Sequence, residues 1–276
     1  MKGCIIQDVT PLDTKRMTFD FGTHQYSLTI VGSGQPLVCL HGFSESGYTW
    51  ENIHIPGYRM IRIDHLGHGS SSKPLAANLY TLSTMMSDLH YIIQAVAGES
   101  YALMGYSMGA RIALLYALTY GNEISHLILE SGSVGIRDLN KRQARLVADD
   151  ALASKIESHD SDWFAKMWQQ VPIFQSQQAL PVNTQQKIYA RRAHNEPHAL
   201  AATLRGSGQG VMPYVGDAVA NLSMPVLYIS GSLDEKYTEI GSTYFTKGHQ
   251  IIDGAGHNTH VEDPCRFMEL VGEFLP

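Results

Sequence analysis

Short apolar runs alternate with longer helical patterns along most of this chain. The runs are almost continuously apolar, which is typical of strands covered on both faces rather than of strands with one solvated face. Six of them end in glycine or polar residues and occupy residues 36–43, 58–64, 101–106, 126–131, 224–231 and 249–256. Between the second and the third, apolar side chains recur at helical spacing, at Leu82, Met85, Met86, Leu89 and Ile93. This order predicts an α/β fold, with a mostly parallel central sheet and helices on both faces.

One long segment interrupts the alternation. Residues 135–210 contain no strand-like run, and their helical stretches are rich in arginine, glutamine, alanine and tryptophan. We therefore predict that residues 1–134 and 211–276 form one core domain, split in the sequence, and that residues 135–210 are inserted as a helical cap. Near the N-terminus, residues 16–32 alternate around Gly22 as a hairpin does, which predicts an extra edge of the sheet.

Length, charge and cysteine content exclude several classes of protein. The 276 residues suit one large globular domain, and the net charge of -6 argues against a nucleic-acid or membrane-surface partner. No stretch approaches the roughly 20 apolar residues that span a bilayer, and the N-terminal residues hold no sustained apolar run, so we expect a cytoplasmic protein. Cys4, Cys39 and Cys265 fit neither a disulfide framework nor a zinc motif, so we expect reduced thiols. The choice between monomer and homodimer stays open.

A glycine-flanked serine follows the third apolar run and precedes a helical pattern, in the sequence "GYSMG" of residues 105–109. The two glycines allow a turn so tight that Ser107 is lifted clear of the sheet, and the following helix directs its first amides at the same place. The pentapeptide alone is compatible with an ordinary turn. A catalytic serine also needs a base and a carboxylate that orients the base.

Both partners follow later strand-like runs. Asp234 comes just after residues 224–231, and His257 just after residues 249–256, in the chain order Ser, Asp, His of α/β hydrolases. The amides of Phe43, in the loop "HGF", and of Met108 are the expected oxyanion hole. Residues 64–74, "DHLGHGSSSKP", resemble a loop common in the same superfamily. We therefore predict the α/β-hydrolase fold.

No metal or organic cofactor is expected. His257 and His260 lie three residues apart, a spacing compatible with chelation, but no third ligand lies at a suitable spacing, and Asp234 is available to orient His257.

Arginine distinguishes this chain from a simple esterase. Arg111 lies one helical turn after Ser107 and therefore shares its face, although a salt-bridged core arginine is an equally good interpretation. The predicted cap contains six more arginines, each of which could be a solvated surface charge: Arg137, Arg142, Arg145, Arg191, Arg192 and Arg205. Together with Arg111 they indicate a pocket for a small polycarboxylate, because a planar guanidinium donates two parallel hydrogen bonds to a carboxylate.

Several longer motifs carry a specific resemblance from about Leu37 to the C-terminus. They read "HGFSES", "GYSMGARIAL", "LESGSVGI", "WQQVPIF", "RRAHNEPHALAATLRGSGQG", "GSLDEKY" and "AGHNTHVEDP". Together they resemble the 2-succinyl-6-hydroxy-2,4-cyclohexadiene-1-carboxylate synthases of menaquinone (vitamin K2) biosynthesis, the MenH family. The resemblance implies a lyase that removes pyruvate from 2-succinyl-5-enolpyruvyl-6-hydroxy-3-cyclohexene-1-carboxylate, which has three carboxylates.

The resemblance also implies roles for individual residues. Ser107, Asp234 and His257 match the family's triad, and the Phe43 and Met108 amides match its oxyanion hole. The residues that match substrate-binding positions are Tyr106, Arg111, Arg145, Arg192 and Trp168.

Three functions stay open at this point. The first is the lyase reaction, in which the triad abstracts a proton. The second is hydrolysis of a carboxylester or of a C–C bond, with Ser107 as nucleophile. The third is a non-catalytic receptor that retains the hydrolase fold.

Overall fold

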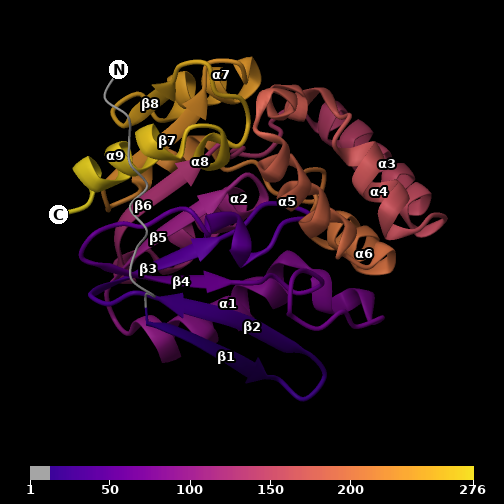
Figure 1. Cartoon of the computed structure of the whole chain (residues 1–276), viewed down its shortest axis with the longest axis horizontal. Coiled ribbons are helices and arrows are strands. Elements are labelled where there is room, and N and C mark those ends of the chain that lie inside the picture. The colour runs from indigo at the N-terminus through magenta and orange to yellow at the C-terminus, as the bar shows by residue number, and fades with distance from the viewer. Residues whose placement is uncertain (1–12) are drawn as a thin grey trace.

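The computed structural model describes residues 13–276, and an eight-stranded sheet organises them (Figure 1). The strands are β1 (Thr14–Asp20), β2 (Gln25–Val31), β3 (Gln35–Leu40), β4 (Tyr58–Ile63), β5 (Tyr101–Tyr106), β6 (Ile124–Glu130), β7 (Val226–Gly231) and β8 (His249–Ile252). Their order across the sheet is β1-β2-β4-β3-β5-β6-β7-β8. The pairs β1–β2 and β2–β4 are antiparallel, and all other neighbours are parallel. The predicted mostly parallel sheet is therefore confirmed.

The sequence pattern located most strands to within a few residues of their observed ends. The expected hairpin is present, since β1 and β2 pair around Gly22, whose φ of 80° belongs to the left-handed region that glycine favours. The largest difference is at β8, which was expected over residues 249–256. It ends at Ile252 because Gly254, at φ 74°, turns the chain into the loop that carries His257.

Helices cover both faces of the sheet. They are α1 (Leu82–Ala97), α2 (Met108–Tyr120), α3 (Leu139–Glu157), α4 (Ser161–Trp168), α5 (Val182–Ala193), α6 (Pro197–Ser207), α7 (Glu235–Tyr244), α8 (Thr259–Glu262) and α9 (Pro264–Phe274). Five 3-10 segments accompany them: η1 (Gly47–Trp50), η2 (Ala77–Tyr80), η3 (Gly121–Glu123), η4 (Pro172–Ala179) and η5 (Gly216–Asn221). One apolar cluster joins α1 and α2 to the sheet, and a second joins η1 and α9 to it. Within residues 13–276, no helix is long and apolar enough to cross a membrane.

The chain between β6 and β7 holds α3 to α6, which gather beyond one end of the strands, at the right of Figure 1. These helices bury a small apolar cluster of their own: Ala153, Ile156, Phe164, Leu200, Ala201 and Leu204. The expected helical content of this segment agrees with that arrangement. Its boundaries as a cap domain stay a prediction.

The cysteines differ from one another. Cys39 is free and buried in β3, where burial raises the pKa of its thiol to about 12. Cys265 is disulfide-bonded, so the expectation of a reduced thiol is wrong there. Cys4 lies outside the described residues.

The turn between β5 and α2 depends on close backbone contacts. Ser107 has φ 52° and ψ -105°, a conformation that costs a non-glycine residue about 1–3 kcal/mol. A Cβ on Gly105 would lie 2.4 Å from the Gly109 carbonyl oxygen, and a Cβ on Gly109 would lie 2.2 Å from that of Leu40. Both glycines of the motif are therefore required by packing, which is the physical reason for the pentapeptide.

We expect Gly109→Ala to destabilise the fold by roughly 2–3 kcal/mol, because the added methyl group meets rigid backbone of β3. Gly272→Ala is the matched control, since a Cβ there has no heavy atom within 4 Å in the exposed part of α9. That change should be neutral or stabilising by up to about 1 kcal/mol. Urea unfolding of both variants measures the difference, and equal stability would contradict the packing argument.

Candidate active site

Three parallel strands carry the predicted triad at their carboxyl ends. Ser107 directly follows β5, Asp234 precedes α7 just beyond β7, and His257 lies in the loop after β8. The Nδ1 atom of His257 lies 2.6 Å from Asp234 Oδ2, and its Nε2 atom lies 2.9 Å from the Ser107 Oγ atom. The structure therefore brings together the three residues that the sequence analysis placed at separate strand ends.

This hydrogen-bond chain defines a protonation pattern. His257 donates its Nδ1–H to the Asp234 carboxylate, which leaves Nε2 to accept the Ser107 hydroxyl proton. The imidazole and the carboxylate are almost fully buried. The arrangement can make Ser107 either a nucleophile or a base that acts through its alkoxide.

Glu262 supports the loop that carries His257, and sequence reasoning did not identify it. Its carboxylate accepts hydrogen bonds from the amides of Gly256, at 2.7 Å, and Asn258, at 3.1 Å. Burial raises the pKa of Glu262, although these amides oppose the shift. One carboxylate thus holds the backbone on both sides of His257.

The two predicted oxyanion donors lie beside the serine. Met108 is the first residue of α2, so its N–H has no partner within the helix. Phe43 follows β3 in the neighbouring loop, and both residues line the same cavity as Ser107. Their role as an oxyanion hole is part of the proposal below.

The cavity at Ser107 has a volume of about 220 Å³. Of the predicted site residues, it is lined by Phe43, Ser107, Met108, Arg111, Arg145, Trp168 and His257. Sequence reasoning missed several other lining residues, among them Lys236, Tyr237, Phe174 and Gln209. The motif "GSLDEKY" contains two of them, so their proximity to Asp234 was the available signal.

Arg111 brings a buried positive charge into this cavity. Its Nη1 atom donates to the Ser207 carbonyl oxygen at 3.0 Å, and its pKa is lowered by burial to about 10, so it is cationic at neutral pH. Within residues 13–276, no ion pair forms at Arg111 or Lys236. The alternative of a salt-bridged core arginine therefore does not describe Arg111.

Arg145 reaches the cavity from α3 and is held on two sides. Its Nε atom pairs with Asp149 at 2.7 Å, and its Nη1 atom donates to Gln209 Oε1 at 2.9 Å. Gln209 in turn donates to the Tyr237 hydroxyl at 2.8 Å. The structure thus joins the predicted cap to α7 through a polar chain that begins at Arg145.

Arg192 and Tyr106 do not line the cavity. Arg192 borders a neighbouring cavity of about 310 Å³, and its guanidinium lies 4.4 Å from the ring centroid of Phe174, which lines both cavities. Tyr106 is buried beside His257, with ring centroids 5.5 Å apart. The substrate-binding roles of these two residues stay predictions.

Aromatic side chains line the cavity beside the triad. Trp168 lies 5.3 Å from Phe43 and 5.9 Å from Phe174, between ring centroids. Phe174 lies 5.9 Å from His257. Trp168 therefore lines the cavity at Ser107, and its role in substrate binding stays a prediction.

His260 belongs to a separate buried network. Its Nδ1 atom lies 2.6 Å from Glu130 Oε2, its Nε2 atom lies 2.7 Å from the Thr49 hydroxyl, and its ring stacks on Trp50. Since His257 and His260 each have a carboxylate of their own, they do not converge on one point. Within the part of the chain that the structure describes, no cluster of three potential ligands could hold a metal ion.

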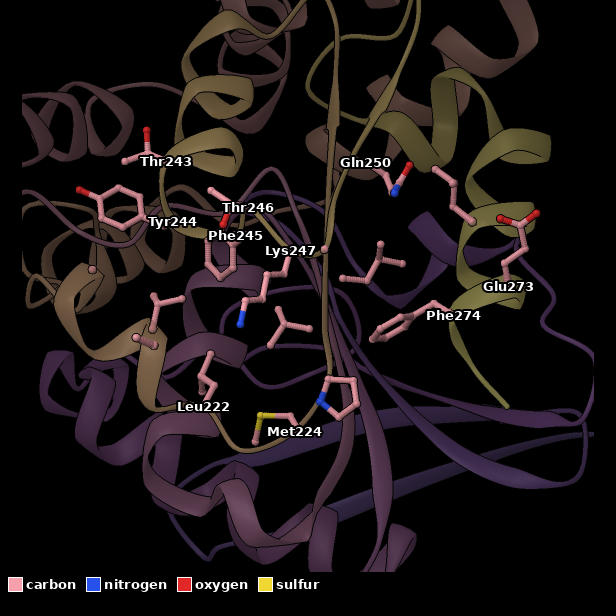
Figure 2. Close-up of a pocket in the computed structure, with 18 of the residues that line it drawn as sticks. Leu222, Met224, Thr243, Tyr244, Phe245, Thr246, Lys247, Gln250, Glu273 and Phe274 are labelled. Carbon is pink, nitrogen blue, oxygen red and sulfur yellow. The ribbon is translucent and has the colours of Figure 1, made fainter.

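A larger cavity lies far from this chemistry. It has a volume of about 950 Å³ and lies beside the amino ends of β7 and β8, lined by Met224, Phe245 and Phe274 among others (Figure 2). The residues that Figure 2 labels include one lysine, Lys247, and none of the triad. Its size alone does not make it a candidate active site, because the hydrogen-bonded pair Ser107 and His257 lines the smaller cavity instead.

Three buried histidines lie behind the Phe43 loop. The rings of His41 and His65 are 4.5 Å apart, and His68 lies 5.3 Å from His41. His41 bonds the Gly42 carbonyl through Nδ1 and accepts from the His65 amide through Nε2, so both nitrogens are used by the neutral ring. Burial lowers the pKa of His41 to about 4 and that of His68 to about 3.

Comparison with known proteins places this site in a class. A family model described as the alpha/beta hydrolase fold matches residues 35–264. The chain therefore belongs to the α/β-hydrolase family.

Relatives define the branch of that family. A Bacillus subtilis (strain 168) protein, provisionally named 2-succinyl-6-hydroxy-2,4-cyclohexadiene-1-carboxylate synthase, is 36% identical over 249 residues, which are 88% of this chain and 91% of that protein. An Enterobacter sp. (strain 638) synthase of the same name is 29% identical and matches 87% of this chain and 91% of its own. The structure of MenH from S. aureus is similar at a TM-score of 0.84 and 32% identity, covering 95% of this chain and 97% of that one. This chain is a member of that synthase family, as the sequence motifs predicted.

The histidine cluster predicts acid-sensitive stability. Between pH 6.5 and about 4 the unfolded chain binds a proton at His41 that the folded chain does not, so the free energy of unfolding falls as the pH falls. His41 alone accounts for about 3 kcal/mol across this window. Urea unfolding between pH 7 and 4.5 measures the slope, and His41→Gln should flatten it. An unchanged free energy of unfolding would contradict the assignment.

Proposed function

We propose that this protein is a lyase of menaquinone biosynthesis that eliminates pyruvate from 2-succinyl-5-enolpyruvyl-6-hydroxy-3-cyclohexene-1-carboxylate. The product is 2-succinyl-6-hydroxy-2,4-cyclohexadiene-1-carboxylate, which is named in the relatives that the chain matches. The observation that carries the proposal is a buried arginine, Arg111, that forms no ion pair within residues 13–276 and lies in the cavity that holds Ser107 and His257. A carboxylate of a polyanionic substrate supplies the ion-pair partner that these residues do not give Arg111.

The reaction uses the triad as a base. His257, oriented by Asp234, takes the Ser107 proton, and the serine alkoxide removes the proton from the ring carbon that bears the succinyl ketone. The electrons of the broken C–H bond shift through the ring double bond and expel the enolpyruvyl oxygen at C5. The released enol becomes pyruvate by taking up a proton, which balances the one abstracted. In the diene product, ring carbon 2 therefore belongs to one of the two double bonds.

The oxyanion hole explains why the same triad serves this chemistry. Abstraction of the proton places negative charge on the succinyl ketone oxygen, which the Phe43 and Met108 amides receive. The substrate offers no ester at this position, so Ser107 has no acyl group to take up. Each charge-assisted bond from Arg111, Arg145 or Lys236 contributes roughly 1.5–3 kcal/mol, so that two or three supply much of a micromolar affinity.

The proposal also covers the cap, the cellular location and the oligomeric state of the protein. Residues 135–210 act as a cap that supplies Arg145 and Trp168 to a cavity whose triad comes from the core. The cytoplasmic location stays a prediction from the sequence, as does the choice between monomer and homodimer.

One alternative has a specific observation in its favour. The intact hydrogen-bond chain from Asp234 to Ser107 is also what a serine esterase or C–C hydrolase requires. Such an enzyme forms an acyl-enzyme and gives a burst with activated esters. A receptor without activity would instead be stabilised by ligand and show no turnover.

The direct test is pyruvate release by the purified protein, with its substrate generated enzymatically in place and diene absorbance followed in parallel. We expect both products in equal amounts, and Ser107→Ala should lower kcat by at least about a thousandfold. Release at the spontaneous rate alone, together with rapid hydrolysis of small activated esters, would favour the hydrolase alternative.

The variant Arg111→Met tests whether Arg111 binds a carboxylate of the substrate. Loss of one charge-assisted hydrogen bond should lower kcat/KM by about 10- to 100-fold, mainly through a higher KM. Arg137→Gln is the matched control, since this arginine is exposed and pairs with Asp217 away from the cavity. The assignment of Arg111 is wrong if the two variants have the same kcat/KM.

A further inference from the structure

The loop that presents the Phe43 amide has a costly local conformation. Ser44, the next residue, has φ 64°, and its hydroxyl is buried without a hydrogen-bond partner in the described chain. A left-handed non-glycine residue and an unsatisfied buried hydroxyl each cost of order 1–3 kcal/mol. Such a conformation persists only where surrounding contacts impose it.

Helix α5 of the predicted cap supplies those contacts. Arg191 donates from Nε to Glu45 Oε2 at 2.6 Å, and Arg192 Nε lies 3.9 Å from Glu45 Oε1. Just beyond the helix, Asn195 donates from Nδ2 to the Ser44 carbonyl oxygen at 2.8 Å. The two residues that follow Phe43 are therefore both held from the same end of α5.

The charges in this contact are buried. The Glu45 side chain is 3% exposed, that of Arg192 is 2% exposed and that of Arg191 is 13% exposed. Burial alone would raise the pKa of Glu45, but the two guanidinium groups outweigh it and lower the pKa. A buried pair of this kind is geometrically demanding, because removing one partner leaves an uncompensated charge.

We propose that Glu45 is a positioning residue for the reaction: clamped by Arg191 and Arg192, its carboxylate fixes the loop so that the Phe43 amide points at the oxyanion. This inference rests on the proposed function, because it requires an oxyanion at that amide. It gives Arg191 a role other than the polycarboxylate binding that the sequence indicated for the cap arginines as a group, and it gives Arg192 a protein partner in addition to the predicted substrate.

The clamp acts on the transition state more than on substrate binding. The negative charge at the ketone oxygen develops as the proton leaves, so a misdirected amide lowers kcat and leaves KM nearly unchanged. A substrate-binding arginine behaves differently, since its loss raises KM. The split between kcat and KM therefore separates the two roles.

The experiment measures steady-state pyruvate release by Glu45→Gln, Arg191→Gln and the double variant. We expect each single change to lower kcat by about tenfold or more, with KM within about twofold of the wild-type value. The double variant should be no worse than the poorer single variant, because both changes break one clamp. Asn195→Ala removes the hydrogen bond to the Ser44 carbonyl, together with those to the Arg191 and Arg192 carbonyls at the end of α5. It should give a milder loss of kcat in a variant without a buried unpaired charge.

Lys187→Gln provides the matched control. Lys187 also joins α5 to the core, through a 3.0 Å ion pair, but this pair is partly exposed and its acidic partner is Glu51 rather than Glu45. Its kcat should stay within about twofold of wild type. An equal loss of kcat in Lys187→Gln would overturn the proposal, because it would mean that any contact between α5 and the core affects kcat. Wild-type kcat in folded Glu45→Gln, or a raised KM alone, would overturn it as well.

The outcome for the wild-type protein separates this inference from the proposed function. If wild type releases no pyruvate but hydrolyses an activated ester, the proposed function fails. The same variants are then compared on the ester, whose tetrahedral intermediate needs the same amides. A lowered kcat of Glu45→Gln on the ester supports the clamp, and an unchanged kcat overturns it. Absence of both activities overturns both proposals.

Discussion

The contact between the Gly109 backbone and the Leu40 carbonyl is the constraint on which the site depends. It lets α2 begin directly against β3, and this close approach holds Ser107 in a left-handed conformation at the carboxyl edge of the sheet. Met108, the first residue of α2, and Phe43, in the loop after β3, then line one cavity with the serine. The turn that carries Ser107, the N-terminus of α2 and the proposed oxyanion loop all depend on this one backbone packing, so a single methyl group at residue 109 affects all of them.

The electrostatic character of the cavity, more than the triad, distinguishes one reaction from another on this scaffold. A Ser-His-Asp chain can attack an ester or take a proton from carbon, and its hydrogen-bond geometry is the same in both cases. What differs here is a cationic wall: Arg111 is buried and forms no ion pair within the described residues, and Arg145 is held by Asp149 and Gln209. Burying such positive charges in a small cavity costs free energy, and binding of a polycarboxylate offsets this cost.

Ser107, Asp234 and His257 could be predicted from the sequence because each follows a strand that is recognisable by itself, and parallel strands bring their carboxyl ends together. The surroundings of Arg192 could not be predicted in the same way. Its burial against Phe174 and Glu45 depends on how the α4 to α6 segment packs on the loop after β3, and such contacts leave no local pattern. Lys236 was overlooked because one lysine beside an acidic residue has the appearance of a solvated charge. The role of Glu262 rests on two backbone amides, which carry no side-chain signal.

The central claim is that Ser107 removes a proton from carbon and forms no bond to the substrate. It is tested most directly by the deuterium isotope effect on kcat/KM, with the label at the ring carbon that bears the succinyl group, combined with intact-mass analysis of enzyme quenched during turnover. We expect a normal primary isotope effect, loss of the label from the diene, and enzyme of unmodified mass. Equal kcat/KM for the labelled and unlabelled substrates, with an adduct accumulating on Ser107, would contradict it.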